Sequence, residues 1–311
     1  MKVLVTCPPM LKNIDLFRDQ FTKKGIELIT PEVTQTLSVE ELLELVPNVE
    51  GWIIGDDPAK REVFEAGKKG KLIAAVKWGV GVDNVDFEAC KDLGIPISNT
   101  PRMFGGEVAD LAMAYLLGLA RNSYQIDREV RKGNWIKPSG SSIAGKTVAV
   151  VGLGDIGQAT IRRLKGFDVT IIGYDPFLKE DLTKIGVDIF DSFPNQIEKA
   201  DFIIITCALT PSSKYLINQD TISKMKTGVR IINVSRGPLI NEEHLLAALK
   251  SEKIESVALD VFEVEPLLKN HPILDYPKCI LGAHNGSNTT EGVIRASHKA
   301  IELLFGFLNL S

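Results

Sequence analysis

Short apolar runs alternate along this chain with longer stretches in which apolar residues recur every three or four positions. The first pattern is typical of buried β-strands and the second of amphipathic helices. In the N-terminal third, the alternation predicts strands at 3–6, 27–30, 52–55, 72–76 and 95–98, with helices at 14–24, 39–45, 59–68 and 85–93. Strands that alternate with helices in this way favour a parallel sheet covered by helices on both faces.

A second series of apolar runs predicts a second sheet. Its six strands are expected at 148–151, 169–173, 202–206, 230–234, 256–261 and 279–282. Six strands with intervening helices are the number in a complete double mononucleotide-binding fold. Two further stretches are helical: residues 106–121, which are apolar nearly all round, and residues 290–310, which are apolar on one face.

These two helices bear on the domain organisation. The helix 106–121, which is apolar nearly all round, must be buried on more than one side, so it can cross between domains or pack against a second subunit. The one-sided helix 290–310 can return to the first sheet. In that case the N-terminal domain is discontinuous in sequence.

Three glycines lie between the first two strands of the second series. Gly152, Gly154 and Gly157 follow the apolar run 148–151, and a helix-like stretch, 158–165, begins at once. The first glycine allows a tight turn, the second lets backbone approach a pyrophosphate, and the third lets the helix pack closely on the strand. The helix N-terminus also offers unpaired N–H groups to an anion. A glycine-rich turn alone would explain the glycines, but the complete strand–turn–helix–strand unit favours a dinucleotide-binding site.

The next strand ends on an acid, Asp175, which indicates which dinucleotide binds. It lies roughly 20 residues beyond the glycines, where such folds carry the ribose-binding carboxylate. A carboxylate accepts hydrogen bonds from both ribose hydroxyls but repels a 2′-phosphate. Pro176 and Phe177 follow it, and Lys179 is the nearest cation. The sequence therefore predicts NAD rather than NADP.

The composition is that of an ordinary globular protein. The chain has 311 residues, 44% hydrophobic and 24% charged, with a formal net charge of −4 and scattered Lys and Arg. This length suggests about two domains, and the scattered basic residues argue against a nucleic-acid partner. No stretch is typical of a membrane span or a secretion signal, so we expect a cytoplasmic protein without membrane contact. The wide spacing of the four cysteines indicates neither a metal site nor a disulfide framework, and we expect small buried apolar residues at Cys7, Cys90, Cys207 and Cys279.

Residues with anion-binding and acid–base chemistry follow three strands of the second series. Arg236 follows the fourth strand and His284 follows the sixth. Three acids, Asp260, Glu263 and Glu265, lie at or just after the end of the fifth. The carboxyl ends of parallel strands lie at one edge of the sheet, where ligands bind. An arginine can hold a carboxylate as a planar fork, and a histidine supported by an acid can exchange a proton. Beside a nicotinamide, this set predicts hydride transfer coupled to proton transfer, and the spacing leaves open which acid supports the histidine.

Other interpretations exist for some of these residues. Arg236 precedes Gly237-Pro238, so an ordinary turn into a helix would explain it. His244 is expected on a solvated helix face, and His271 and His298 are expected to be structural. Of the four histidines, only His284 ends a predicted strand.

The segments together resemble the D-isomer-specific 2-hydroxyacid dehydrogenase family along essentially the whole chain, and most closely its short phosphoglycerate dehydrogenase-like members. They match in order and spacing. The matching segments are 79–86, 99–101, 152–157, 209–211, 233–237, 259–262, 265–266 and His284.

The resemblance implies a fold and a set of functional residues. The fold is α/β, with two doubly wound parallel-sheet domains: a discontinuous, flavodoxin-like substrate domain (1–101 plus 287–311) and a Rossmann NAD-binding domain (102–286). The catalytic set implied is Arg236, Glu265 and His284, which selects Glu265 among the acids. Substrate binding is implied for the backbone of Trp78, Gly79, Val80 and Gly81 together with Arg236, and cofactor binding, besides the three glycines, for Val80, Asp155, Ile156, Asp175, Cys207, Val234 and Asp260. A homodimer built on the helix from Gly106, and domain closure, are implied as well.

Several positions depart from the family pattern. Lys77-Trp78 replaces an Arg followed by a small residue, Arg102 stands where Gly is usual, and Asn285 replaces an apolar residue. Asp56-Asp57 occupies the loop where phosphoglycerate enzymes carry a phosphate-binding Arg. Two acids there would repel a dianion, which Lys60, Arg61, Lys77 or Arg102 would have to offset.

The leading hypothesis is an NAD-dependent dehydrogenase that interconverts a D-2-hydroxy acid and its 2-keto acid. 3-Phosphoglycerate and other phosphorylated or sugar-derived acids remain open as substrates. The second hypothesis is a non-enzymatic NAD(H)-sensing regulator of a protein partner.

Overall fold

The computed structural model describes residues 1–178 and 186–310, so Lys179 lies outside the described residues. The chain divides into two compact units, and the first is discontinuous in sequence. Unit 1 comprises Met1–Met103 and Asn288–Ser311, and unit 2 comprises Phe104–Ser287. The boundaries predicted from sequence, 101/102 and 286/287, lie within two residues of these.

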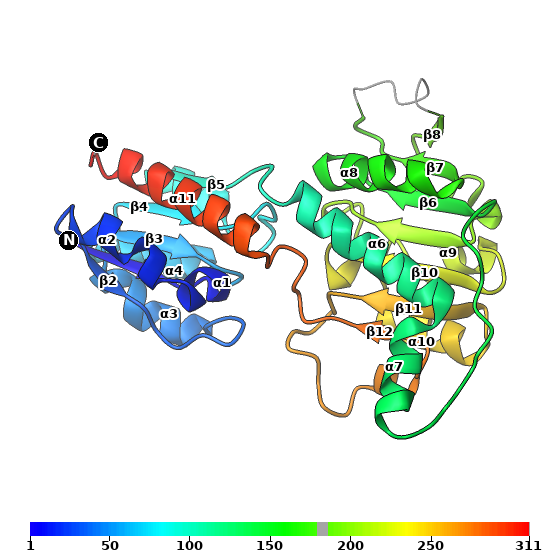
Figure 1. Ribbon diagram of the computed structural model, residues 1–311. Coiled ribbons are helices and arrows are strands. Elements are labelled where there is room, and N and C mark those ends of the chain that lie inside the picture. Colours follow the sequence, from blue (N-terminus) through cyan, green and yellow to red (C-terminus); the bar gives the residue numbers. More distant parts are fainter. Residues whose placement is uncertain (179–185, 311) are drawn as a thin grey trace. The chain divides into compact units, whose positions relative to one another are not determined.

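Unit 1 contains a five-stranded parallel sheet in the order β2-β1-β3-β4-β5 (Figure 1). This is the flavodoxin-like order, in which the strand sequence reverses between β1 and β3. All five strands overlap the apolar runs that predict them, and β4 and β5 each begin two residues later and end one residue later than predicted. The strands are β1 Lys2–Val5, β2 Glu27–Ile29, β3 Gly51–Ile54, β4 Ala74–Lys77 and β5 Ile97–Asn99.

Helices cover both faces of this sheet. On one face, Trp52 of β3 and Ala75 of β4 join a buried cluster with residues of α3, α4 and α5. On the other face α11 packs against β3 and β4 and contacts α1, so the C-terminal helix belongs to the N-terminal unit. The helices of unit 1 are α1 Pro8–Lys12, α2 Asp15–Thr22, α3 Val39–Leu45, α4 Arg61–Lys69, α5 Phe87–Asp92 and α11 Thr290–Phe307.

Unit 2 contains a seven-stranded parallel sheet in the order β12-β11-β10-β9-β6-β7-β8 (Figure 1). The Rossmann arrangement is confirmed, but the prediction of six strands is wrong. The missed strand is β8, a short edge strand whose sequence Val-Asp-Ile-Phe alternates too briefly to stand out. The strands are β6 Thr147–Val151, β7 Thr170–Tyr174, β8 Val187–Phe190, β9 Phe202–Ile205, β10 Val229–Asn233, β11 Ile254–Leu259 and β12 Ile280–Leu281.

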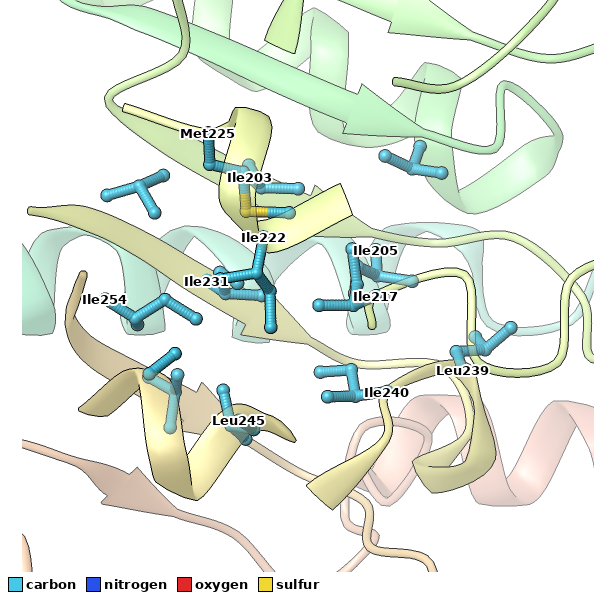
Figure 2. Close-up of a cluster of buried hydrophobic side chains, with 14 of the residues drawn as sticks. Ile203, Ile205, Ile217, Ile222, Met225, Ile231, Leu239, Ile240, Leu245 and Ile254 are labelled. Carbon is cyan, nitrogen blue, oxygen red and sulfur yellow. The ribbon is translucent and has the colours of Figure 1, made fainter. Parts of the chain in front are cut away.

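The core of unit 2 lies on both faces of its sheet. Figure 2 shows Ile203 of β9 and Ile231 of β10 packed with Ile222 and Leu245, which come from α9 and α10. Neighbouring strand residues such as Ile232 are equally buried and face the other way, where α6 and α8 lie. The helices are α6 Gly105–Arg121, α7 Ser123–Arg131, α8 Asp155–Leu164, α9 Gln219–Lys224 and α10 Glu242–Lys250.

The helix that was predicted to be buried on more than one side, α6, is covered largely by its own unit. α6 contacts α8, β10, β11 and β12, and ten of its 17 residues are buried. α6 therefore does not need a second subunit to cover most of its surface.

The turn between β6 and α8 requires glycine for packing reasons. A Cβ on Gly157 would lie 1.9 Å from the carbonyl oxygen of Gly152, and a Cβ on Gly152 would lie 2.4 Å from the backbone nitrogen of Cys207. Gly152 also has a φ of +96°. A Cβ on Gly154, in contrast, would meet nothing within 4 Å. Two glycines are needed by the fold, and the third leaves open space at the N-terminus of α8.

We therefore expect Gly157→Ala to be much more destabilising than Gly154→Ala. Backbone must move to admit the first methyl group, which should lower the unfolding temperature by about 8 °C or more, or prevent folding. Gly154→Ala should change it by less than about 4 °C, since only an exposed N-cap is altered. Thermal unfolding followed by circular dichroism measures both. Equal stability of the two variants would contradict this account of the turn.

Candidate functional site

Three strands of unit 2 bring the predicted catalytic residues to one edge of its sheet. Arg236 follows β10 by three residues, and His284 follows β12. Glu265 lies in the segment after β11, the strand paired with both β10 and β12. Because all three strands run parallel, these side chains lie at the same, carboxyl edge.

His284 forms an ion-pair contact with Glu265. Its Nδ1 lies 2.7 Å from Oε2 of Glu265, and each side chain is 21% exposed. The other oxygen of Glu265 accepts a hydrogen bond of 2.9 Å from the backbone N–H of Phe262, which fixes the carboxylate. With Nδ1 held by the acid, Nε2 is the ring nitrogen that can exchange a proton with a substrate. Among the acids that the sequence left open, the structure brings Glu265 to the histidine.

The backbone of His284 is held in an uncommon conformation. Its φ is +51°, in the left-handed region that costs a non-glycine residue about 1 kcal/mol or more. Its N–H donates to the carbonyl of Asp260 at 2.6 Å. The Asp260 carboxylate accepts from the N–H of Gly286 at 2.8 Å and from the hydroxyl of Tyr115 at 3.3 Å. Asp260 thus braces both ends of the segment that presents the imidazole.

Asp260 was predicted to contact the cofactor. The hydrogen bonds that it accepts give it a structural role in holding the His284 segment. It is only 1% exposed. Burial, followed by the charge of Asp260, raises the pKa of Tyr115, so this hydroxyl stays protonated and donates. Tyr115, on α6, is a positioning residue that sequence reasoning missed, because a tyrosine in an apolar helix looks like any other core residue.

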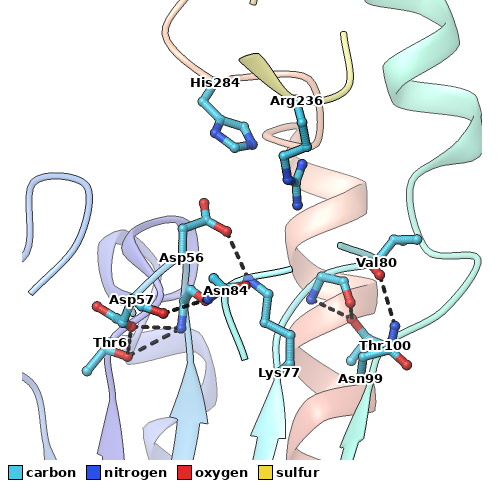
Figure 3. A network of polar contacts seen from close by, with 12 residues as sticks. Thr6, Asp56, Asp57, Lys77, Val80, Asn84, Asn99, Thr100, Arg236 and His284 are labelled. Atoms are coloured by element: carbon cyan, nitrogen blue, oxygen red, sulfur yellow. Dashed lines mark hydrogen bonds and ion pairs between the residues drawn. The ribbon is translucent and has the colours of Figure 1, made fainter. Parts of the chain in front are cut away.

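Arg236 lies at the start of a short 3-10 helix, Gly237–Leu239, so the ordinary helix-entry turn is present. The turn is nevertheless built around the arginine. Asn233 donates to the carbonyl of Arg236 at 2.8 Å and accepts from the N–H of Ser235 at 3.0 Å. A Cβ on Gly237 would lie 1.9 Å from the Phe262 carbonyl, so the loop after β11 fits tightly against the turn. Figure 3 draws the side chain of Arg236 on this turn and that of His284 on the segment after β12.

The glycine turn and Asp175 form the candidate cofactor site of unit 2. One oxygen of Asp175 accepts from the N–H of Leu153, and the other accepts from the N–H of Phe177, each at 2.8 Å. The acid is thereby held beside the glycine turn, where a ribose would lie. Gly154 and Asp155 are exposed at the N-terminus of α8, and the open space over Gly154 suits a pyrophosphate. These residues fit a bound NAD.

The remaining predicted cofactor contacts lie at the neighbouring strand ends. Ile156 lies in the first turn of α8, Cys207 follows β9 and Val234 follows β10. Burial raises the pKa of Cys207 to about 11, so it is a neutral thiol rather than a reactive thiolate. Cys7, Cys90 and Cys279 are buried, as predicted, whereas Cys207 is only partly so.

Unit 1 presents the predicted substrate loop, 78–81, after β4. Gly79 has a φ of +123°, donates to Thr100 Oγ1 at 2.8 Å and accepts from the Thr100 N–H at 3.1 Å. Asn99 donates to the carbonyl of Val80 at 3.1 Å. Trp78 is 5% exposed and its side chain donates to Ser297 of α11, so this side chain is part of the interior of unit 1. Thr100 and Asn99 therefore fix the loop. The N–H of Trp78 donates to the carbonyl of Ile54 at 2.9 Å and the N–H of Gly79 donates to Thr100, so the candidate anion binders are the N–H groups of Val80 and Gly81.

Asp56 and Asp57, the two acids of the loop after β3, both have partners. They therefore do not act as two uncompensated negative charges, as the sequence suggested. Asp56 lies 2.8 Å from the ammonium of Lys77 (Figure 3). Asp57 is fully buried and accepts hydrogen bonds from the backbone N–H groups of Leu37 and Gly55 and from Thr6. Burial raises the pKa of Asp57 against the effect of these three donors.

Of the other candidate cations, Arg61 is already engaged, with Asp92 at 2.8 Å and Asp86 at 4.0 Å. Arg102 has a φ of +58°, in the left-handed region where Gly is usual in the family pattern. Asn285 adjoins the proposed catalytic histidine, and its side chain is assigned no role.

The other histidines occupy the structural places expected, with one difference. His271 caps a short helix and contacts Glu242 at 3.1 Å, and His298 packs edge-on against Phe17. His244 is half-buried rather than solvated, because its Nδ1 accepts from the N–H of Gln219 at 3.3 Å. Within 1–178 and 186–310, no three His, Cys, Asp or Glu side chains are grouped to hold a metal ion.

Comparison with known proteins identifies the family. Residues 113–286 match the family model described as D-isomer specific 2-hydroxyacid dehydrogenase, NAD binding domain. The chain is 39% identical over 295 residues to D-3-phosphoglycerate dehydrogenase of Methanocaldococcus jannaschii, covering 94% of this chain and 54% of that protein. It is 35% identical over 286 residues to hydroxypyruvate reductase of Thermotoga maritima, covering 90% of this chain and 92% of that protein.

Solved structures agree. The chain is similar to the NAD-dependent formate dehydrogenase of Staphylococcus aureus in complex with NAD, with a TM-score of 0.87 at 26% identity, covering 100% of this chain and 97% of that one. The chain belongs to the D-isomer-specific 2-hydroxyacid dehydrogenase family, and unit 2 contains the family's NAD-binding domain. It spans about half the length of the first phosphoglycerate dehydrogenases that it matches, 54% and 49%. In the part of the chain that the structure describes, no helix has the length and apolar character needed to cross a membrane.

Asp175→Ser should relax the preference for NADH over NADPH. The serine keeps one acceptor for the backbone N–H groups that Asp175 now holds, but it removes the charge that would repel a 2′-phosphate. We expect the ratio of the two dissociation constants, measured by quenching of protein fluorescence, to change by about 10-fold or more. Asp188→Ser, at an exposed acid on β8, is the control and should leave the ratio unchanged. An unchanged ratio in Asp175→Ser would remove Asp175 from the cofactor site.

Proposed function

We propose that this protein is an NAD-dependent oxidoreductase that interconverts a D-2-hydroxy acid and its 2-keto acid. The observation that carries the proposal is the His284–Glu265 pair at 2.7 Å, at the same sheet edge as Arg236 and the glycine turn. Family membership supports it, since the matching relatives include a hydroxypyruvate reductase and a phosphoglycerate dehydrogenase. 3-Phosphoglycerate is one candidate substrate.

The roles follow from the chemistry of the residues. NADH, when bound, supplies a hydride to the keto carbon. Arg236 binds the substrate carboxylate and draws electron density from the carbonyl through its planar guanidinium. His284, as the imidazolium, donates a proton from Nε2 to the carbonyl oxygen as the hydroxyl forms, and the neutral ring takes the proton back in oxidation. Glu265 orients the ring and stabilises its charge.

The two units divide the binding tasks in this proposal. Unit 2 holds the cofactor through its glycine turn, Asp155, Ile156, Asp175, Cys207, Val234 and Asp260. Unit 1 is the substrate domain. Its loop 78–81 offers the backbone N–H groups of Val80 and Gly81 to the substrate, with Val80 also near the cofactor. The exposure of Val80, 40%, and the anchoring of its carbonyl by Asn99 support a loop that is both accessible and fixed.

We further propose a homodimer and a cytoplasmic location. The surface of α7 and the segment after it exposes large apolar side chains, with Tyr124 39%, Val130 42% and Trp135 80% exposed. Such a group favours contact with a second subunit. All four cysteines are free, which suits a reducing compartment.

Substitution of His284 and of Arg236 tests the proposed activity. For a 2-keto acid that the wild-type protein reduces, His284→Ala should lower kcat by about 100-fold or more, because the proton donor is lost. Arg236→Ala should have an effect of similar size, and both variants should still bind NADH. His298→Ala, at an exposed histidine of α11, is the control. A protein that only senses NAD(H) would bind the cofactor without turning over any 2-keto acid, and that result would overturn the proposal.

Glu265→Gln should change the pH dependence of turnover. A neutral amide stabilises the imidazolium less than a carboxylate does, so the proton donor is lost at lower pH. The pH above which kcat/KM for reduction declines should therefore move down by about one unit or more. Glu263→Gln removes a charge from the same loop without touching His284 and should keep the original profile. If the Glu265→Gln profile does not move, the pairing has no role in proton transfer.

A further inference from the structure

The carboxyl end of β4 carries a buried ammonium group. The Lys77 side chain is only 2% exposed, and its Nζ donates to the carbonyl of Gly55 at 2.6 Å and to Asp56 at 2.8 Å. Asp56 is more open, with 36% of its side chain exposed. Figure 3 shows the lysine rising from β4 to the loop that holds both acids.

An ammonium withdrawn from water needs three acceptors, because each of its three N–H groups loses a water partner. Gly55 and Asp56 supply two acceptors among the described residues. A buried charge with an unfilled donor position costs stability, and a purely structural lysine would be expected to fill it. The third donor position therefore suits a ligand.

The ammonium of Lys77 lies next to the proposed substrate loop, 78–81. A Cβ built on Gly79 would have Cε and Nζ of Lys77 as its nearest neighbours, both at 3.8 Å, and no other atom within 4 Å. β3 and β4 pair with Ile54 opposite Lys77, so the loops that follow both strands lie at one edge. A 2-keto acid held by the backbone of the loop 78–81 would thus carry its remaining substituent close to Lys77 and Asp56.

The pair has no net charge and offers two kinds of contact. The ammonium donates a hydrogen bond and the carboxylate accepts one, which is the complement of an alcohol oxygen and its proton. A phosphate dianion would be attracted by Lys77 but repelled by Asp56 at nearly the same distance, and it brings no proton for the carboxylate. A methyl group would leave both charged groups desolvated without a partner.

We propose that Asp56 and Lys77 select a substrate with a free hydroxyl on the carbon next to the keto carbon, and discriminate against its phosphate ester. This inference rests on the proposed function and specifies its substrate class: small 3-hydroxylated 2-keto acids and the corresponding D-2,3-dihydroxy acids. Reduction of such a substrate consumes one hydride and one proton at the keto group, and the hydroxyl that the pair binds is unchanged.

The first experiment needs no variant. Hydroxypyruvate and pyruvate differ only in this hydroxyl, and 3-phosphohydroxypyruvate carries the phosphate ester in its place. With NADH, kcat/KM for hydroxypyruvate should exceed both others by about 10-fold or more. Equal values, or preference for the phosphate ester, would overturn the inference and leave the proposed function standing. Turnover of no 2-keto acid would overturn both.

The second experiment assigns the selectivity to the pair. Asp56→Asn removes the charge while keeping the shape, so the ratio of kcat/KM for hydroxypyruvate to that for 3-phosphohydroxypyruvate should fall by about 10-fold or more. Asp92→Asn, at an exposed acid of the same unit, should leave the ratio as it is. An unchanged ratio in Asp56→Asn would contradict the inference, because it would show that the Asp56–Lys77 pair does not select the substrate.

Lys77→Met alone would leave Asp56 beside an apolar side chain, so it is combined with Asp56→Asn to remove both charges together. The double variant should lose the preference for hydroxypyruvate over pyruvate, while its unfolding temperature reports whether the fold is intact. Lys71→Met, at the exposed lysine that precedes β4, is the matched control and should retain the preference. A folded double variant that still prefers hydroxypyruvate would contradict the inference.

Discussion

Because the strand pairs in both sheets run parallel, every strand delivers the residue that follows it to the same edge of its sheet. This constraint brings Arg236 and His284, 48 positions apart in sequence, to one edge without any direct link between them. It acts in the same way on Asp56 and Lys77 in unit 1. Burial of isoleucine and valine on both faces of each sheet maintains the pairing, so apolar packing far from the chemistry sets the position of the polar groups.

Polar side chains at these edges are held by backbone groups more often than by one another. Asn233 shapes the turn of Arg236, Asp260 holds the segment of His284, and Phe262 fixes Glu265 through its N–H. A backbone donor cannot change rotamer, so such contacts fix a carboxylate or amide at little entropic cost. The left-handed φ of His284 is tolerated because Asp260 holds the backbone at and beyond this residue. Its carbonyl accepts from the N–H of His284, and its carboxylate accepts from the N–H of Gly286.

Functional and structural roles could be predicted from the sequence wherever the residue type itself indicates the role. Gly152 and Gly157 could be interpreted at once, since no other residue fits the turn, and His284 stood out as the histidine that ends a strand. Tyr115, Asn233 and Thr100 could not be found in this way, because a hydroxyl or amide in a buried element gives no sign of its partner. The edge strand β8 escaped because four residues that are buried on one side give too short a periodic pattern.

Asp56 and Asp57 show why the substrate could not be read from motifs alone. Adjacent and chemically identical, they were expected to act together as negative charge, yet one lies beside an ammonium and the other is sealed among three donors with a raised pKa. The electrostatic field that a substrate would meet depends on Lys77, 21 positions beyond Asp56, and this contact becomes visible only when β3 and β4 are paired. The proposed reaction type rests on an arginine, a histidine and a glutamate, whose chemistry few other residues can supply. The choice of substrate depends on how far Lys77 neutralises Asp56. That contact exists only once the strands of unit 1 have paired.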